Sequence, residues 1–121
     1  MDAKRRGAKI VGINPFYNSG LGAIADEWIP IRPATDAALF IGCAYHMIEN
    51  DLQDQAFLDT YTVGFDADHV PEGADPKDNF KDYVLGTLRW CAEDAGMGER
   101  EICGVEPEVI RSLATDMASC D

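Results

Sequence analysis

The chain has only two segments with the pattern of a β-strand, and both are short. Residues 8–13 (AKIVGI) are β-branched and almost continuously apolar, which is typical of a strand buried on both faces. An Asn-Pro pair ends this segment, because proline has no N–H to donate to a neighbouring strand. Residues 28–31 form the second candidate, and an Arg-Pro pair follows it. The sheet must therefore be small, and helices must supply most of the fold.

Residues 35–50 have the clearest helical pattern. The Thr35 hydroxyl can cap the free N–H groups of the first turn, and Asp36 stands where the helix dipole favours a negative charge. Asn50 is a reasonable end. Apolar residues at helical spacing predict one inward face, formed by Ala37, Ala38, Phe40, Ile41, Ala44, Tyr45 and Ile48.

Other helices are expected at 54–61, at 80–95 and from Glu106-Pro107 onward, where proline suits the first turn. The chain begins with what looks like a helix end, capped by Gly7. The inward residues predicted for the two later helices are Tyr83, Val84, Leu88 and Cys91, and then Val109, Ile110, Leu113, Ala114 and Met117.

Short strands flanked by helices are typical of parallel sheets covered on both faces. Because two strands make a poor sheet, we predict a helix-rich α/β fold: a partial three-layer domain with short parallel strands, whose other strands come from elsewhere. The length of 121 residues suits one domain, so residues 1–121 are expected to form a single partial domain. Residues 64–79 are acidic, with two prolines and two glycines, and predict an exposed loop.

Charge and composition exclude several classes of function. The net charge is −12, and from residue 10 onward there are six basic against 21 acidic side chains. Such a body repels phosphate backbones, so no nucleic-acid partner is expected. No apolar run approaches the ~20 residues of a membrane span. The N-terminus lacks the apolar region of a secretory signal, so nothing in this chain directs it out of the cytoplasm.

The cysteines do not predict a metal centre. Cys43, Cys91, Cys103 and Cys120 form no C-x-x-C pair, and only two histidines are present. We therefore expect no metal ligands, no iron–sulfur cluster ligated by this chain and no disulfide framework. Cys43 falls in a helical apolar pattern and is expected in the core.

A glycine-rich stretch resembles a nucleotide-binding loop but lacks the spacing that such a loop requires. Residues 20–25 read as G-x-G-x-x-A. A dinucleotide fingerprint has its glycines directly after the strand and a long helix behind them. Here five residues intervene, and only about one helical turn fits before the next strand, too short to pack along the sheet. Gly20 and Gly22 are therefore expected to be ordinary loop glycines.

Two other places could meet a ligand. Asn14-Pro15-Phe16 follows a strand end, where ligands collect in open α/β sheets, although Asn-Pro also favours a simple turn. The stretch Arg32 to Asp36 runs into a helix start. A carboxylate there offers two acceptors to the two adjacent donors of guanine, but Asp36 could equally be a dipole-stabilising residue. Arg32 could neutralise a phosphate or pair with a surface acid.

Residues 25–39 (ADEWIPIRPATDAAL) resemble a signature segment of the dimethyl sulfoxide reductase family, the molybdopterin-dependent oxidoreductases. The resemblance is greatest to the catalytic A subunits of the anaerobic enzymes. GAKIVGINP looks like the family's strand ending in Asp-Pro-Arg, and residues 44–66 (AYHMIENDLQDQAFLDTYTVGFD) follow its next helices and loop. YVLG, Trp90 and ICGVEPEVIRSLA match later landmarks in order. The resemblance spans nearly the whole chain.

The resemblance implies an interior piece of a longer catalytic subunit, in a domain that holds one of two molybdopterin guanine dinucleotides. The implied contacts to the nucleotide end fall on six residues: Asn14, Pro15, Phe16, Ala34, Thr35 and Asp36. Two departures weaken the match. Asn-Pro-Phe replaces the usual Asp-Pro-Arg and loses a guanidinium. Ala34 replaces a glycine, which restricts the backbone where a positive φ is needed.

The family's molybdenum ligand, its iron–sulfur cysteines and its second cofactor domain have no counterpart here, so no catalytic residue is assigned. The resemblance implies two-electron reduction of an S-oxide or N-oxide by the complete subunit. The implied partners are the remaining segments of that subunit and an iron–sulfur electron-transfer subunit, with export by the twin-arginine route usual in the family. The alternatives are a non-catalytic acidic binding module or an inactive gene relic. A nicotinamide-dependent dehydrogenase is disfavoured by the failed fingerprint.

Overall fold

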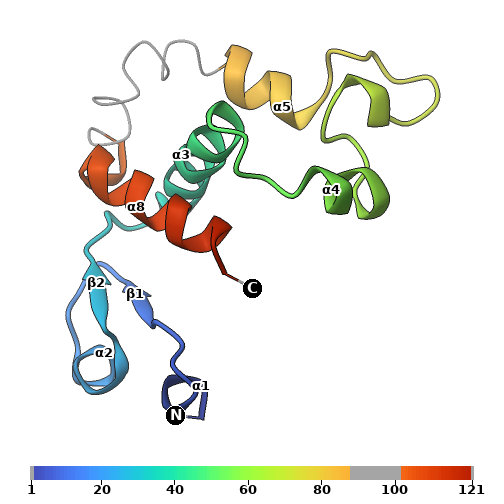
Figure 1. The fold of residues 1–121 in the computed structure, drawn as a ribbon. Helices are drawn as coiled ribbons and strands as arrows, with labels where there is room; N and C mark the ends of the chain where they lie inside the picture. The colour runs from blue at the N-terminus through green and yellow to red at the C-terminus, as the bar shows by residue number, and fades with distance from the viewer. Residues whose placement is uncertain (1, 88–101, 121) are drawn as a thin grey trace.

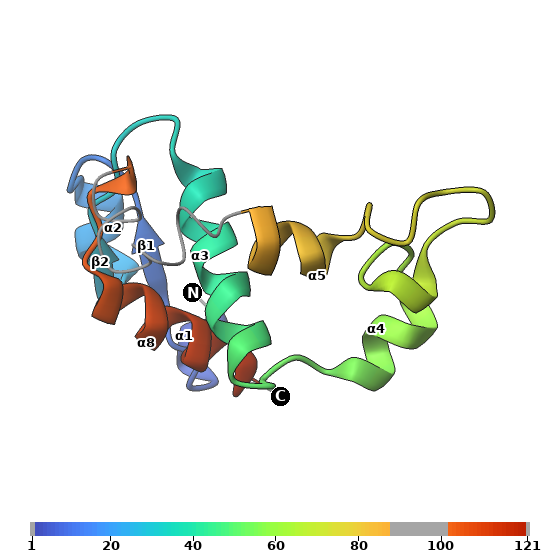
Figure 2. The ribbon, with the colours of Figure 1, turned by 90° about the horizontal axis from the view of Figure 1, so that it is seen from above.

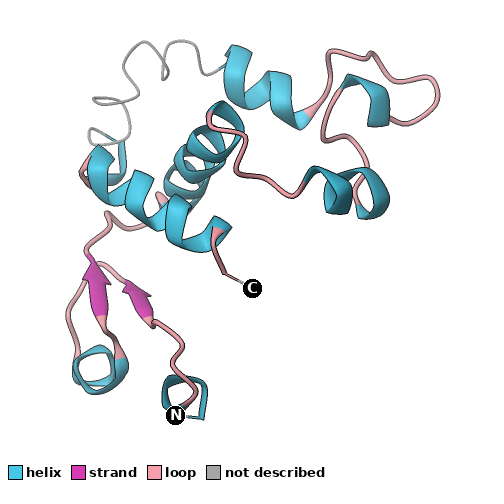
Figure 3. Ribbon diagram, in the orientation of Figure 1, coloured by secondary structure: helices cyan, strands magenta, loops and turns pink. Residues whose placement is uncertain are grey.

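A computed structural model of the chain describes residues 2–87 and 102–120. Strands β1 (Val11–Ile13) and β2 (Glu27–Ile29) pair in parallel, with Val11 opposite Glu27 and Ile13 opposite Ile29. Helix α2 (Ser19–Ile24) connects them, and α1 (Asp2–Arg5) precedes them (Figures 1 and 3). The small parallel sheet in a helix-rich fold confirms the predicted class.

Both strands are shorter than the sequence pattern suggested. Before β1, the Ile10 N–H donates to the Asp26 carboxylate at 2.9 Å, so a side chain takes the place of a ladder partner. Lys4 donates to the same carboxylate, and these bonds hold the pKa of Asp26 below its usual value. β2 ends at Ile29 because Pro30 has no N–H to continue the ladder.

The glycine-rich stretch is helical, so the loop predicted for Gly20 and Gly22 is wrong. Asn18 caps α2 by accepting from the Leu21 N–H at 3.0 Å. The helix also packs on the sheet, contrary to expectation. A Cβ on Gly12 of β1 would lie 2.2 Å from Cδ2 of Leu21, so glycine leaves the space that this leucine fills.

The opposite face of the sheet is covered by α3 (Asp36–Glu49) and α8 (Pro107–Ala118), which lie side by side (Figure 2). Lys9 links the two layers, because its ammonium contacts Glu27 at 2.8 Å and Asp116 of α8 at 2.5 Å. These carboxylates hold the pKa of Lys9 above its usual value. The core between the layers consists of Ile29, Ile31, Leu39, Cys43, Cys103, Val105, Ile110, Leu113 and Ala114.

The predicted faces of the long helices are partly wrong. Leu39 and Cys43, fully or nearly fully buried, form the inner face of α3, whereas Phe40 is 46% exposed and Ala37 lies on the surface. The expected core position of Cys43 is confirmed. On α8 the buried stripe is Ile110, Leu113 and Ala114, and Met117 is half exposed. α3 packs between two apolar clusters, so its buried side chains point in two directions and do not form a single stripe.

The second cluster lies on the other side of α3 from the sheet (Figures 1 and 2). There Ile48 meets Phe65 and Val84, with Ile41, Tyr45, Leu58 and Leu85 packed around them. Phe65 comes from the exposed loop at 64–79, and Val84 comes from the short π-helix η2 (Tyr83–Thr87) that follows α5 (Phe80–Asp82). The remaining element is α4 (Gln55–Tyr61), capped by Asp54.

The sequence-based boundaries of α4 and α8 hold, including Pro107 at the first turn of α8. The acidic segment at 64–79 is mostly exposed, although Phe65 anchors its start. The helix predicted over 80–95 is described as far as Thr87. Val84 is buried as predicted, but Tyr83 is 47% exposed, and Leu88 and Cys91 lie outside the described residues.

Candidate functional site

The two predicted binding segments leave the sheet at the same edge. Ile13 and Ile29 are paired and end their strands, and the Asn14 N–H still donates to the Ile29 carbonyl at 3.2 Å. Residues 14–16 therefore start beside the point from which residues 30–36 lead into α3 (Figure 1). This is the carboxyl edge of a parallel sheet, the usual position of ligands in open α/β folds.

Asn14 makes the tight turn that Asn-Pro favours. Its side-chain Oδ1 accepts from the Phe16 N–H at 3.2 Å, and its carbonyl accepts from the indole N–H of Trp28 at 2.9 Å. The Trp28 ring also meets the edge of Tyr17, with ring centroids 5.2 Å apart. The turn leaves the Phe16 ring 74% exposed. The side-chain oxygen and the backbone carbonyl of Asn14 are thus both engaged locally, and Phe16 offers an apolar ring at the strand end.

The entry into α3 is a strained turn. Ala34 has φ +64°, a left-handed conformation that disfavours residues with a Cβ. The Thr35 hydroxyl donates to the Arg32 carbonyl at 2.7 Å and makes no bond to the first turn of the helix. Thr35 occupies the N-cap position as predicted, but the predicted hydrogen bond from the helix N–H groups to its hydroxyl is wrong. Its hydroxyl closes the turn that redirects the chain from the strand into the helix.

Asp36 is the first residue of the 14-residue helix α3, and it is exposed. Among residues 2–87 and 102–120, no hydrogen bond or ion pair engages its carboxylate. Both oxygens are thus available to an external donor pair. A helix N-terminus also carries partial positive charge and unpaired N–H groups, so a ligand at this place meets further donors nearby.

Arg32 lies over the turn that precedes α8. Its backbone N–H donates to the Cys103 carbonyl at 2.9 Å, and its guanidinium donates to the Ile102 carbonyl at 3.4 Å. Gly104, with φ +76°, allows this approach, since a Cβ there would lie 3.3 Å from Cγ of Arg32. Arg32 thereby connects the segment after β2 to the segment before α8, at the same end of the sheet.

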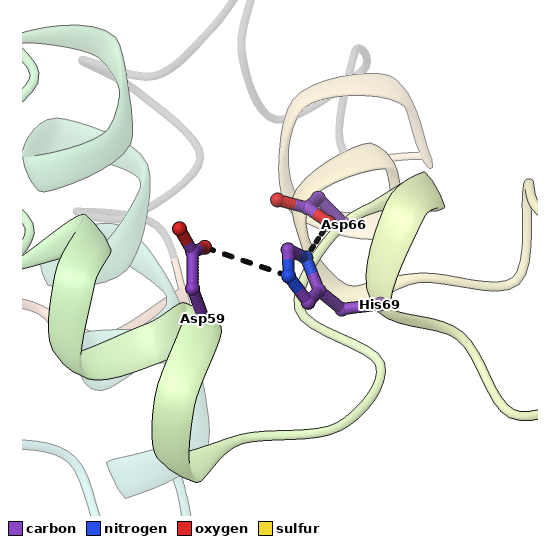
Figure 4. A group of neighbouring side chains, drawn as sticks. All are labelled: Asp59, Asp66 and His69. Carbon is purple, nitrogen blue, oxygen red and sulfur yellow. Dashed lines mark hydrogen bonds and ion pairs between the residues drawn. The ribbon is translucent and has the colours of Figure 1, made fainter.

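The sequence pattern did not predict a cluster of polar side chains around His69. Asp59 on α4 and Asp66 before the short helix Ala67–His69 face the two nitrogens of His69 (Figure 4). The Asp66–His69 spacing of three residues is a visible sequence signal, because it places both on one turn. Asp59 belongs to another element, and its approach depends on tertiary structure. This cluster lies on the far side of α3 from the strand ends (Figure 1).

A hollow beside α5 is lined by Lys77, Asp78, Asn79, Phe80, Asp82, Tyr83 and Gly86. Its one buried polar residue is Asn79, whose side chain accepts from the Asp82 N–H and donates to the Pro76 carbonyl and the Asp82 carboxylate. These bonds satisfy the Asn79 amide, so its role is to cap α5. In the part of the chain that the structure describes, no helix has the length and apolarity to cross a membrane.

The fold and the strand-edge segments define a parallel α/β unit that continues into helix α3. No family model matches the chain. Dimethyl sulfoxide reductase DmsA of Haemophilus influenzae is 41% identical over 95% of this chain, and DmsA of Escherichia coli is 39% identical over 96%. Acetylene hydratase from Pelobacter acetylenicus matches 98% of this chain with a TM-score of 0.70 and 27% identity. The chain spans 14% of the length of each of these proteins.

The chain belongs, as a segment, to the dimethyl sulfoxide reductase family of molybdopterin oxidoreductases. This confirms the resemblance drawn from residues 25–39. The DmsA relatives are named as reductases, whereas the structural neighbour is named as a hydratase.

Proposed function

We propose that this chain contributes to binding the guanine dinucleotide end of a molybdopterin cofactor within a catalytic subunit of this family. The observation that carries the proposal is the Asp36 carboxylate, exposed at the start of α3 and engaged by no described residue. It lies on the segment that leaves β2 at the carboxyl edge, next to the Asn14 turn after β1.

The recognition follows from matching donors and acceptors. Guanine presents its ring N–H and its exocyclic amine side by side, and a carboxylate presents two acceptors at the same spacing. In this arrangement Asp36 would hold the guanine edge. Ala34 and Thr35 would shape the turn below it through the positive φ and the bond to Arg32. Pro15 and the exposed Phe16 ring would bound the other side of the site.

The residues fit the group in part. Asp36 supplies the required acceptors. In contrast, the Oδ1 atom of Asn14 already accepts a hydrogen bond within its own turn, and Phe16 offers no charge for a phosphate. The cofactor, when bound, supplies the molybdenum redox chemistry. The residues of this chain bind and orient its nucleotide end and take no proton or electron in the reaction.

In the complete subunit we propose two-electron reduction of an S-oxide or N-oxide. The proposed partners are the remaining segments of that subunit and an iron–sulfur electron-transfer subunit. Support comes from the named reductase relatives, which are about seven times as long as this chain. The different activity named for the structural neighbour supports assigning this segment to cofactor binding and leaving substrate choice to other segments.

Calorimetry with GDP tests the role of Asp36. We expect the chain to bind GDP at sub-millimolar concentration, and Asp36→Asn to weaken it about tenfold to hundredfold, since hydrogen bonds to a charged group are worth roughly 1.5–3 kcal/mol. With xanthosine diphosphate the order of affinities should reverse, so that the Asp36→Asn variant binds more tightly than the natural chain. Xanthine replaces one donor with an acceptor, which the asparagine amide matches and the carboxylate repels.

Glu108→Gln is the matched control, because Glu108 is also a carboxylate in the first turn of a helix but already pairs with Arg111 at 2.6 Å. It should leave GDP binding unchanged. No heat at millimolar GDP, or equal binding by both nucleotides in the Asp36→Asn variant, would refute the proposal.

A further inference from the structure

The His69 cluster is arranged for a doubly protonated ring. Nδ1 lies 2.6 Å from the Asp66 Oδ1 atom, and Nε2 lies 3.7 Å from the Asp59 Oδ1 atom (Figure 4). A neutral imidazole carries one N–H and can donate to one of these carboxylates only. The other nitrogen would then turn a lone pair toward a negative oxygen. The imidazolium has an N–H on both nitrogens, so it can hydrogen-bond to Asp66 and attract the Asp59 carboxylate as an ion pair.

The cluster joins two elements that are otherwise connected by few contacts. Asp59 lies on α4, whereas Asp66 caps the short helix Ala67–His69 at the base of the acidic loop. Gln55 of α4 supports the connection, since its amide donates to Asp59 at 2.6 Å and reaches Asp66 at 3.5 Å. The apolar part of this contact comes from Leu58, which packs against the cluster around Phe65.

The base of the loop is itself well bonded. The Gly64 N–H donates to the His69 carbonyl at 2.7 Å, and the Gly64 carbonyl accepts from the Phe80 N–H at 2.8 Å. The Lys81 N–H donates to the Phe65 carbonyl at 2.8 Å. His69 therefore belongs to a fixed frame, and its charge adds an ionic contribution to the contact between α4 and that frame.

We propose that protonation of His69 fastens α4 to the base of the 64–79 loop through Asp59 and Asp66, making this joint a pH-responsive device. It involves none of the strand-edge residues, so it stands independently of the nucleotide role. The three acids are the whole charge environment of the ring among the described residues: Asp59 from α4, and Asp66 and Asp68 from the loop base.

The sign of the pH dependence follows from the charges. The hydrogen bond to Asp66 raises the pKa of His69, so the contribution of the ring is complete below about pH 6.5 and is lost as pH rises through the raised value. The same bond lowers the pKa of Asp66, so its contribution is present above its unfolded value and is lost only in stronger acid. The joint is therefore tightest in mildly acidic solution and loosens toward alkaline pH.

NMR titration and hydrogen exchange test the device in the full chain. We expect the His69 midpoint to lie above that of a model histidine and to fall by at least half a pH unit in Asp66→Asn, with a smaller fall in Asp59→Asn. Protection factors of the α4 amides, corrected for intrinsic exchange, should drop at least threefold between pH 6 and pH 8.5. His69→Lys, a permanent cation over this range, should abolish that pH dependence while His69→Gln lowers protection throughout.

His46→Gln is the matched control, because His46 lies on α3 and contacts Asn50 and Thr115. It should leave the α4 profile unchanged. Equal protection at pH 6 and pH 8.5 in the natural chain would refute the proposal, as would a His69 midpoint unaffected by Asp66→Asn. Binding of Zn²⁺ or Mn²⁺ at micromolar concentration, with loss of the His69 proton, would also overturn it, because the cluster would then be a cation site.

Discussion

Replacing Ala34 with glycine should stabilise the fold. Ala34 has φ +64° in the turn that links β2 to α3. The left-handed conformation costs a residue with a Cβ about 1–2 kcal/mol. Glycine avoids this cost but gives the unfolded chain more freedom, which offsets roughly 0.5–1 kcal/mol. The net gain in the free energy of unfolding is then about 1 kcal/mol.

The gain can be read from the midpoint of thermal unfolding. With an unfolding entropy of roughly 2.1 cal/mol/K per residue, about 1 kcal/mol in a chain of this length corresponds to a rise of about 4 °C. Urea unfolding followed by tryptophan fluorescence should show a matching shift of the midpoint at constant slope.

Ala37→Gly provides the matched control, because Ala37 lies three residues further on, at the second position of α3, and is exposed. A glycine in a helix removes backbone restriction without relieving strain, so this variant should lose up to about 1 kcal/mol. An Ala34→Gly protein that melts at or below the temperature of the natural chain would refute the argument that the turn stores backbone strain.

Three further substitutions test the packing and the caps. Leu39→Ala should lower the free energy of unfolding in urea by about 3 kcal/mol, since Leu39 is fully buried. Phe40→Ala next to it should lower it by less than about 1 kcal/mol, because that ring is 46% exposed. Equal losses would contradict the assignment of Leu39 to the buried face of α3. Asp54→Ala removes the acceptor of the Phe57 N–H at 2.9 Å and should cost about 1 kcal/mol, with faster exchange of the first α4 amides as its signature; unchanged exchange there would mean that the cap does not hold the helix.

Local patterns predicted most element types and several of their ends correctly, but missed the helix over the glycine-rich stretch. Pro107 and Asn50 mark a helix start and a helix end as their chemistry requires. Some errors arose where a residue has more than one possible local partner, and others where its partner lies far away in the sequence. Thr35 has a hydroxyl suited to capping, but the turn offered it the Arg32 carbonyl. Pro30 was an available signal for the end of β2, and its missing N–H explains the shorter strand.

The candidate site, too, was predictable from local sequence only in part. Asp36 at a helix start and Asn14 at a strand end were identifiable from their positions relative to strands and helices, since these positions follow from local pattern. That both segments share one edge of the sheet depends on the parallel pairing of Ile13 with Ile29. The His69 cluster was missed because Asp59 and Asp66 come together only when α4 folds back on the loop base.

By itself the sequence determined the helix-rich parallel α/β class and the family, because short-range periodicity and a specific run of residues at 25–39 suffice for both. The tertiary structure decided which side chains face each other. It turned α3 so that Leu39 faces the sheet and Phe40 faces solvent, and it placed His69 between two carboxylates. The physical reason is that burial and pairing depend on contacts between distant segments, which no local pattern encodes.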